Sequence, residues 1–273
     1  MNLFHYTDLN GLKGIIENNS LWATNLYFLN DRNEAVHGFL CFENTIQYLD
    51  EKIISAGKKK ILQDALDICK SNGGHGGGTK GTHIYSISFC MDSDKLSQWR
   101  GYGAHQGVCI EFDKEKLIDG LDVSDMTFFH NEVNYTNESS TVKMNESINN
   151  FFSELNLRPE TIDDDFSWFV SSYGLINKVT PFFKNDGFSE ENEYRFVFFP
   201  GYKIPNVLFR VNNNGLVPYI NVEMKKRVKL PIKRVIIGPA KDFQFVFNGV
   251  EMLLDKHGYK EVLIENSKVS YRG

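Results

Sequence analysis

Near the start of the chain, the spacing of apolar residues changes from that of a strand to that of a helix. Residues 3–6 place His5 among apolar and aromatic neighbours, which is typical of a short strand, and the apolar positions within residues 9–16 recur at helical spacing. Either Thr7 or Asp8 can supply the N-cap of that helix. We therefore expect His5 at a strand-to-helix corner, where an imidazole can face a ligand or can be a hydrogen-bonded core residue.

The rest of the chain alternates between the two patterns. Apolar spacing predicts helices at 33–56, 58–72, 93–99, 140–156, 159–175 and 241–256. Runs of β-branched and aromatic residues predict strands at 21–25, 83–89, 107–113, 125–135, 193–199, 206–211, 217–222, 227–230, 233–237 and 261–265. These elements predict an α+β fold, and because there is neither a repeat nor a long Pro/Ser linker, we expect a single domain over residues 1–273.

A helical hairpin followed by a glycine-rich stretch forms an insertion at about 33–81. A phosphate-binding loop needs a strand before it and a helix after it, whereas here a helix precedes residues 73–81 and a strand follows them. We therefore interpret the glycine-rich stretch as a flexible loop or lid.

The distribution of charge along the chain limits the classes of binding partner that we expect. With 273 residues, of which 41% are hydrophobic and 14% aromatic, the chain can bury a large core, and its net charge of −5 argues against a generally basic nucleic-acid-binding surface. The exception is residues 225–234, where six of ten residues are basic. This run, which begins with Lys225, Lys226 and Arg227, fits a phosphate-binding track for RNA or DNA and equally fits a solvated hairpin with edge-strand lysines.

The cysteines and the N-terminal segment indicate the cellular compartment in which we expect the protein. The four cysteines at 41, 69, 90 and 109 lie singly in apolar segments without a Cys-x-x-Cys pair, so we expect reduced core residues and no metal site. The chain starts without a charged segment and apolar run, and no stretch approaches the roughly 20 apolar residues of a membrane span. We expect a cytoplasmic protein without a membrane partner.

Two groups of polar side chains interrupt apolar segments. Alternation along the strand puts Ser86 and Ser88 on one face, which can bind a ligand or can simply meet solvent. Trp99, Arg100 and Tyr102 lie beside glycines, where they offer stacking surfaces and a guanidinium suited to phosphate. A helix C-cap next to a buried tryptophan explains the second group equally well.

A third group lies where the strand at 193–199 begins. If that strand starts by residue 191, then Glu191, Glu193 and Arg195 share a face. Two acids beside an arginine can hold a sugar hydroxyl and a nucleophile. An edge strand that carries solvated charges explains the same residues without any activity.

The order of these motifs along most of the chain carries a resemblance. In sequence they read LFHYT, SLWATN with FLND, SISF, SQWRGYG, GVCIEFD, KNDGFSEENEYR and VIIGP. This order is similar to that of a bacterial family of unknown function linked to phage-defence and toxin loci, with the insertion at 33–80 its least characteristic part. That family in turn resembles the ADP-ribosyltransferase superfamily, whose members split NAD at the nicotinamide glycosidic bond and move ADP-ribose onto protein, DNA or RNA. The resemblance implies a split, mixed or antiparallel β core with peripheral helices.

The resemblance also implies roles for the candidate residues. Glu193 would bond the 2′-hydroxyl of the nicotinamide ribose, Glu191 would orient the acceptor, and His5 would hold a ribose hydroxyl and the nicotinamide amide. The other residues that it implies in NAD binding are Tyr6, Thr7, Asn30, Ser86, Ser88, Trp99, Arg100, Tyr102 and Arg195. It leaves the aromatic residue that stacks on nicotinamide open among Tyr6, Tyr85, Trp99 and Tyr102.

The chemistry fits those residue types. Cleavage of the glycosidic bond develops positive charge on the ribose, so a carboxylate at the 2′-hydroxyl stabilises the transition state more than the ground state, and no metal is required. We expect an NAD-dependent mono-ADP-ribosyltransferase that acts as a toxin or phage-defence effector, with nucleic acid ahead of protein as acceptor and an antitoxin as a further partner. An NAD glycohydrolase and a non-catalytic nucleotide sensor are the alternatives.

Overall fold

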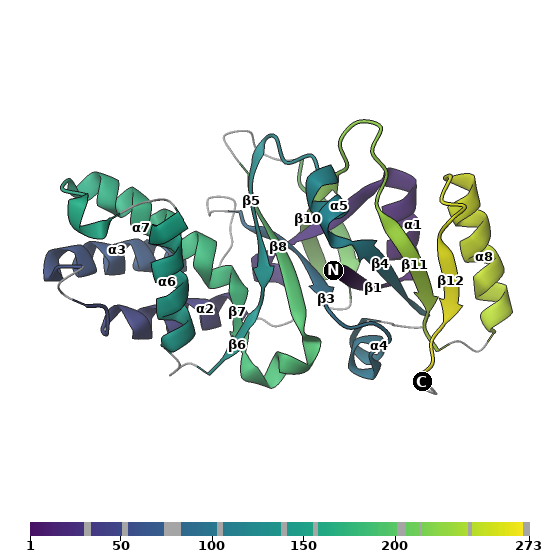
Figure 1. Cartoon of the computed structure of the whole chain (residues 1–273), viewed down its shortest axis with the longest axis horizontal. Helices are drawn as coiled ribbons and strands as arrows, with labels where there is room; N and C mark the ends of the chain where they lie inside the picture. The colour runs from purple at the N-terminus through teal and green to yellow at the C-terminus, as the bar shows by residue number, and fades with distance from the viewer. Residues whose placement is uncertain are drawn as a thin grey trace. The chain divides into compact units, whose positions relative to one another are not determined.

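A computed structural model of the chain describes residues 1–29, 34–50, 54–73, 83–102, 106–137, 141–154, 158–200, 206–212, 215–239 and 242–269 (Figure 1). The chain divides into two compact units. Unit 1 consists of Met1–Thr24, Tyr85–His130 and Glu190–Gly273, and unit 2 of Asn25–Ile84 and Asn131–Ser189. Each unit buries a hydrophobic core of its own, and the fold is α+β with a mixed sheet, as the sequence predicts.

A ten-stranded sheet forms most of unit 1. Its main path runs in the order β12-β11-β4-β1-β3-β2-β10-β9, and β8 pairs with both β3 and β5. Most of its pairings are antiparallel, and β11 with β12 is parallel. The strands are β1 (Asn2–Asp8), β2 (Ser20–Asn25), β3 (Tyr85–Cys90), β4 (Gly107–Asp113), β5 (Met126–Glu132), β8 (Glu193–Pro200), β9 (Leu208–Asn212), β10 (Gly215–Glu223), β11 (Ile232–Ile237) and β12 (Leu263–Asn266).

Helices cover both faces of this sheet. Apolar residues of α1 (Leu9–Asn18) and α8 (Phe243–Lys256) pack with Leu3 and Phe89 in the larger core. On the other face, Trp99 of α4 (Leu96–Tyr102) packs against Tyr6. Aspartates begin three helices of this unit as N-caps: Asp8 accepts a hydrogen bond at the start of α1, Asp113 at the start of α5 (Lys114–Gly120) and Asp242 at the start of α8.

Four helices and a small parallel sheet make up unit 2. The helices are α2 (Glu34–Ile46), α3 (Ala56–Gly73), α6 (Val142–Glu154) and α7 (Asp165–Val179), which gather into one cluster (Figure 1). The sheet pairs β6 (Asn134–Thr136) with β7 (Phe183–Asn185), and 3-10 turns lie at Leu26–Phe28, Pro159–Thr161, Thr180–Phe182 and Asp186–Glu191. Trp168 is buried in the core of this unit, and its indole N–H donates to the Lys58 carbonyl at 2.9 Å. No helix among the described residues is both long and apolar enough to cross a membrane.

Two departures from the sequence prediction have local causes. The predicted strand at 227–230 is a turn, because Arg227 takes a left-handed φ of 67° and the Val228 N–H bonds back to the Lys225 carbonyl. The first helix of the insertion was predicted to end at residue 56 but ends at Ile46, because turn bonds within residues 45–49 replace the helical pattern there. Helix α5 was not predicted. The candidate Asn30 and most of the glycine-rich stretch lie outside the described residues.

Candidate functional site

Strand β1 pairs with β4 over a longer stretch than with β3. β1 pairs with β4 along its whole length, from Asn2 opposite Asp113 to Asp8 opposite Gly107. Its register with β3 consists of Phe4 opposite Cys90. Beyond this pair, the Ser88 carbonyl is met by the His5 side chain, with Nδ1 at 3.1 Å from the oxygen. The ladder between β1 and β3 therefore ends early, and an imidazole bridges the two strands.

His5 is a neutral imidazole in this setting. A carbonyl can only accept, so Nδ1 carries the hydrogen and Nε2 is left as an acceptor. Burial lowers the pKa of His5 and outweighs the hydrogen bond to Ser88, which raises it, while the charge of Arg210 lowers it further. The ring also packs edge-on against Phe89, with centroids 5.7 Å apart. The corner histidine predicted from sequence is thus partly a core residue, with one open acceptor atom.

Four candidate side chains share one face of the neighbouring strands. In the β3–β8 register Ser88 lies opposite Arg195, and Cys90 lies opposite Glu193. Ser86 is two residues before Ser88 and lies on the same face, while Tyr85, Ile87 and Phe89 enter the core on the other face. The alternation predicted for this strand is confirmed. We call Ser86, Ser88, Glu193 and Arg195 the serine–glutamate face; the structure brings these four together and places the His5 ring against the opposite, Phe89 side of β3.

Glu193 and Arg195 form a buried bidentate ion pair. Arg195 Nε lies 2.6 Å from Glu193 Oε1, and Nη2 lies 2.8 Å from Oε2. Glu193 is 3% exposed and Arg195 is 1% exposed. A guanidinium at this distance favours the ionised carboxylate despite its removal from water. A carboxylate can accept several hydrogen bonds at once, so this is the chemistry that a sugar hydroxyl would need at the site.

The Ser86 hydroxyl on the same face has no hydrogen-bond partner. Its side chain is 2% exposed, and its Oγ makes no hydrogen bond within the described residues. A buried hydroxyl without a partner costs roughly 1–3 kcal/mol, so a ligand that supplied one would gain that energy. Ser88 is half-buried and is therefore the most open of the four residues.

Glu191 lies outside strand β8. It belongs to the 3-10 turn Asp186–Glu191, and Asn192 takes a left-handed φ of 43°, so the strand begins only at Glu193. The Asn192 amide donates to Asp92 Oδ2 at 2.9 Å. That bond and one from Lys95 lower the pKa of the Asp92 carboxyl. The shared strand face of Glu191 and Glu193 was predicted for a strand that starts by residue 191, and this condition is not met, because the chain bends at Asn192.

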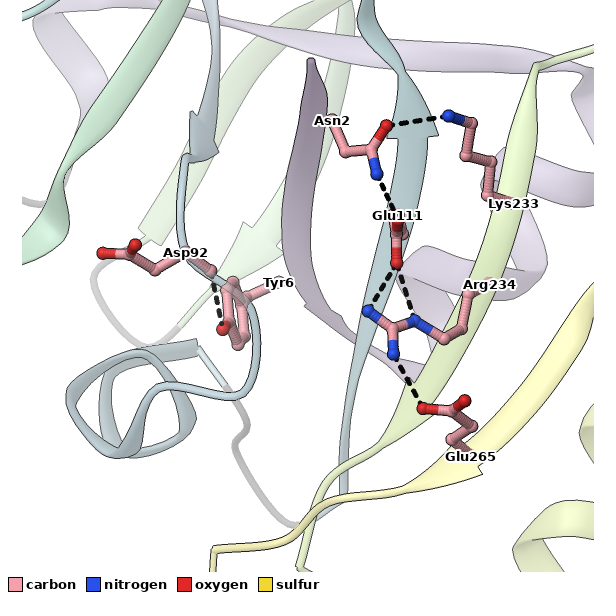
Figure 2. Close-up of polar contacts among 7 residues, drawn as sticks. All are labelled: Asn2, Tyr6, Asp92, Glu111, Lys233, Arg234 and Glu265. Carbon is pink, nitrogen blue, oxygen red and sulfur yellow. Dashed lines mark hydrogen bonds and ion pairs between the residues drawn. The ribbon is translucent and has the colours of Figure 1, made fainter.

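The aromatic candidates differ in exposure. Tyr6, Tyr85 and Trp99 are buried, whereas Tyr102 is 37% exposed. The Tyr6 hydroxyl donates to the Asp92 carbonyl at 3.2 Å and accepts from the Lys95 N–H at 3.0 Å; Figure 2 shows the first of these bonds. The Trp99 indole N–H donates to Asp94 at 2.9 Å. Tyr6 and Trp99 therefore hold the loop between β3 and α4 in place.

Thr7 and Arg100 are not on the strands that carry the serine–glutamate face. Thr7 is half-buried against α1, and its Oγ1 would lie 1.9 Å from a Cβ at position 11, which explains the glycine there. Arg100 is exposed on α4.

Most basic side chains of residues 225–234 bond to other residues of the chain. Lys225 bonds to the Asp119 carbonyl, Lys229 to the carbonyls of residues 257 and 258, and Lys233 to Asn2 and residue 113. Figure 2 shows Arg234 between two carboxylates, those of residues 111 and 265. Lys226 and Arg227 are exposed. These contacts favour the solvated-hairpin interpretation for four of the six basic residues.

Sequence reasoning missed Arg210. From β9 its guanidinium reaches over β10, where it lies 6.0 Å from the Tyr219 ring centre, and its Nη2 donates to Thr24 Oγ1 of β2 at 2.9 Å. We call Thr24, Arg210 and Tyr219 the arginine cluster. Period-2 alternation was the available signal, since Arg210 lies between the exposed Phe209 and Val211.

The cysteines are free and buried, as predicted. His37 and Cys41 lie one turn apart on α2, with Nε2 and Sγ 3.5 Å apart, and both approach the Thr136 hydroxyl. Among the described residues, no three His, Cys, Asp or Glu side chains gather in a way that could hold a metal ion.

Comparison with protein families gives one match. A family described as a protein of unknown function (DUF2971) matches residues 98–196. This range contains Trp99, Glu193 and Arg195, but neither His5 nor Ser86. The match supports the similarity to a family of unknown function, over about a third of the chain rather than most of it. Neither the curated proteins nor the solved structures contain a match to the chain.

Proposed function

We propose that the chain is an NAD-dependent mono-ADP-ribosyltransferase whose NAD site is the serine–glutamate face. The observation that carries the proposal is the Glu193 carboxylate, buried and paired with Arg195, on the strand next to the unpartnered Ser86 hydroxyl. The order of the motifs along the chain and their resemblance to the ADP-ribosyltransferase superfamily add support. In this proposal the core is an ADP-ribosyltransferase-like split sheet, with the split at the short ladder between β1 and β3.

The proposed chemistry assigns Glu193 to the ribose. Its carboxylate would accept a hydrogen bond from the 2′-hydroxyl of the nicotinamide ribose, and it would stabilise the positive charge that develops as the glycosidic bond to nicotinamide breaks. Arg195 would keep Glu193 ionised and oriented, and Ser86 and Ser88 would bond to the nicotinamide end of NAD. Because three of these side chains are buried, binding requires the residues that cover them to move.

The acceptor in this proposal is a nucleic acid ahead of a protein. Lys226 and Arg227 are the exposed cations of the basic run that would contact phosphate. An antitoxin would be a further partner if the chain is a toxin or phage-defence effector.

The assay that tests the proposal follows both halves of NAD. NAD labelled in nicotinamide and in adenylate is incubated with the protein, with and without RNA, DNA and a protein lysate. Released nicotinamide with ADP-ribose fixed to a macromolecule supports transfer. Released nicotinamide with free ADP-ribose indicates a glycohydrolase, and binding without release indicates a sensor.

Two serine variants assign the reaction to the proposed face. Ser86→Ala removes a hydroxyl that has no partner, so the fold should lose little, whereas nicotinamide release should fall about tenfold or more. Ser20→Ala is the matched control, because Ser20 is also buried in unit 1 and its hydroxyl also has no hydrogen bond within the described residues. Equal activity of the wild type and Ser86→Ala would contradict the assignment of the site.

A further inference from the structure

Arg210 differs from two other arginines of unit 1 in what it binds. Arg195 holds the Glu193 carboxylate with two bonds, and Arg234 is held by two carboxylates. Arg210 is half-buried, and its one hydrogen bond within the described residues goes to the Thr24 hydroxyl. A guanidinium has five N–H donors, so most of those on Arg210 have no protein acceptor.

The surroundings of Arg210 compensate its charge only in part. Burial lowers the pKa of Arg210, while the nearby Tyr219 and Asp8 partly offset this. Asp8 makes no ion pair with it, and the Asp8 carboxylate caps α1 by accepting from the Gly11 N–H at 2.7 Å. A partly buried cation without a bonded carboxylate is costly to maintain unless it meets an anion that is not part of the chain.

Thr24 supplies a second donor at the same point. Its side chain is 6% exposed, and its oxygen accepts the hydrogen bond from Arg210. The proton of its hydroxyl is not used by that bond, so it can donate to a ligand. Beside it, the ring of Tyr219 stands 5.1 Å from that of Trp22 and gives the cluster an aromatic wall.

We propose that the arginine cluster binds a phosphate group of a ligand, with Arg210 donating from its planar fork and Thr24 donating from its hydroxyl. The fork matches the spacing of two phosphate oxygens, which is why arginine recognises phosphate better than lysine does. The phosphate comes either from a nucleotide or from free phosphate or pyrophosphate. Binding here does not depend on cleavage of NAD, so the site stands or falls independently of the proposed function.

Isothermal titration of the full chain with three probes tests the site. The probes are inorganic phosphate, pyrophosphate and ADP-ribose, at constant ionic strength. ADP-ribose contains no nicotinamide bond, so the result is independent of the transfer reaction. Tighter binding of ADP-ribose than of pyrophosphate indicates a nucleotide as the source, and the reverse indicates the free anion. No binding of any probe overturns the proposal.

Variants of the cluster locate the bound phosphate. Arg210→Gln should weaken binding about tenfold or more, Arg210→Lys should also weaken it because the fork is lost, and Thr24→Val should weaken it about threefold while it keeps the side-chain shape. Arg158→Gln, which removes an exposed arginine of unit 2, is the matched control and should bind as the wild type does. Thermal melts of each variant report folding. Unchanged affinity in a folded Thr24→Val and a folded Arg210→Lys would overturn the proposal even if Arg210→Gln does not fold.

Discussion

Glu193 and Arg195 are two residues apart on one strand, and they neutralise each other inside unit 1. Both side chains are buried, so each charge is stabilised by its partner rather than by water. Removal of one partner therefore has a different effect from removal of both.

Glu193→Gln should destabilise the chain by about 3–5 kcal/mol, because it removes the carboxylate charge that is paired with the buried Arg195 guanidinium. Urea unfolding at pH 7 measures the loss. The double variant Glu193→Gln/Arg195→Met should recover part of it. If the single variant were as stable as the wild type, the pair would not be buried as described.

Stability should fall as the pH drops below about 6.5. Burial lowers the pKa of His5 from its ordinary value of 6.5, so the folded state binds a proton less readily than the unfolded state does. This contribution to stability is present above pH 6.5 and is lost as the pH falls from there toward the folded pKa. Urea midpoints between pH 7.5 and pH 5 measure the slope, which should be smaller in His5→Gln. The lowered pKa values of Asp92 and other carboxyls act only near pH 4 and below.

Glu111 and Glu265 hold opposite ends of the same guanidinium and should contribute unequally. Glu111 is buried and bonds to Asn2 and Arg234 at 2.6 Å, whereas the Glu265 side chain is 44% exposed. Glu111→Gln should cost about 1–3 kcal/mol in the free energy of unfolding, and Glu265→Gln less than about 1 kcal/mol. Denaturant melts of the two variants provide the comparison, and an equal cost would contradict the difference in burial.

The four cysteines should resist alkylation in the folded protein. Burial raises the pKa of Cys69 to about 12, and it also raises the pKa of Cys90 and Cys109, so the reactive thiolate is scarce at pH 8. Mass spectrometry after iodoacetamide treatment should find little modification without denaturant and four modified residues in guanidinium. Rapid labelling of any native cysteine would show that its segment opens.

Nucleic-acid binding, if present, should depend on Lys226 and Arg227. Each basic residue that contacts phosphate releases counterions, so the slope of log affinity against log salt should flatten by roughly one unit for each residue replaced by glutamine. Lys225→Gln should have a smaller effect, because Lys225 already bonds to the Asp119 carbonyl. Binding of RNA and single-stranded DNA at several salt concentrations tests this, and equal slopes would exclude the run as an acceptor track.

The sequence was most informative where local pattern decides structure. The alternation at 85–89 placed the two serines on one face, and the strand at 107–113 was predicted with its observed bounds, because both depend on neighbouring residues. The bend at Asn192 and the turn at Arg227 escaped prediction, since each depends on one non-glycine residue with positive φ. The contact between Arg210 and Thr24 joins residues 186 positions apart, and no periodicity encodes such a pairing. For the same reason, the sequence did not predict on which side of β3 the His5 ring lies, because this depends on the register between β1 and β3.

The strand order also constrains the timing of assembly during synthesis. β2 pairs with β10, β4 pairs with β11, and Asn19 bonds to the Val228 carbonyl 209 positions later. β2 and β4 must therefore wait for partners made near the end of translation, and sheets built from such distant pairings fold slowly. Until then, β2 and β4 each present an unpaired edge, which makes the nascent chain a candidate substrate for holding chaperones.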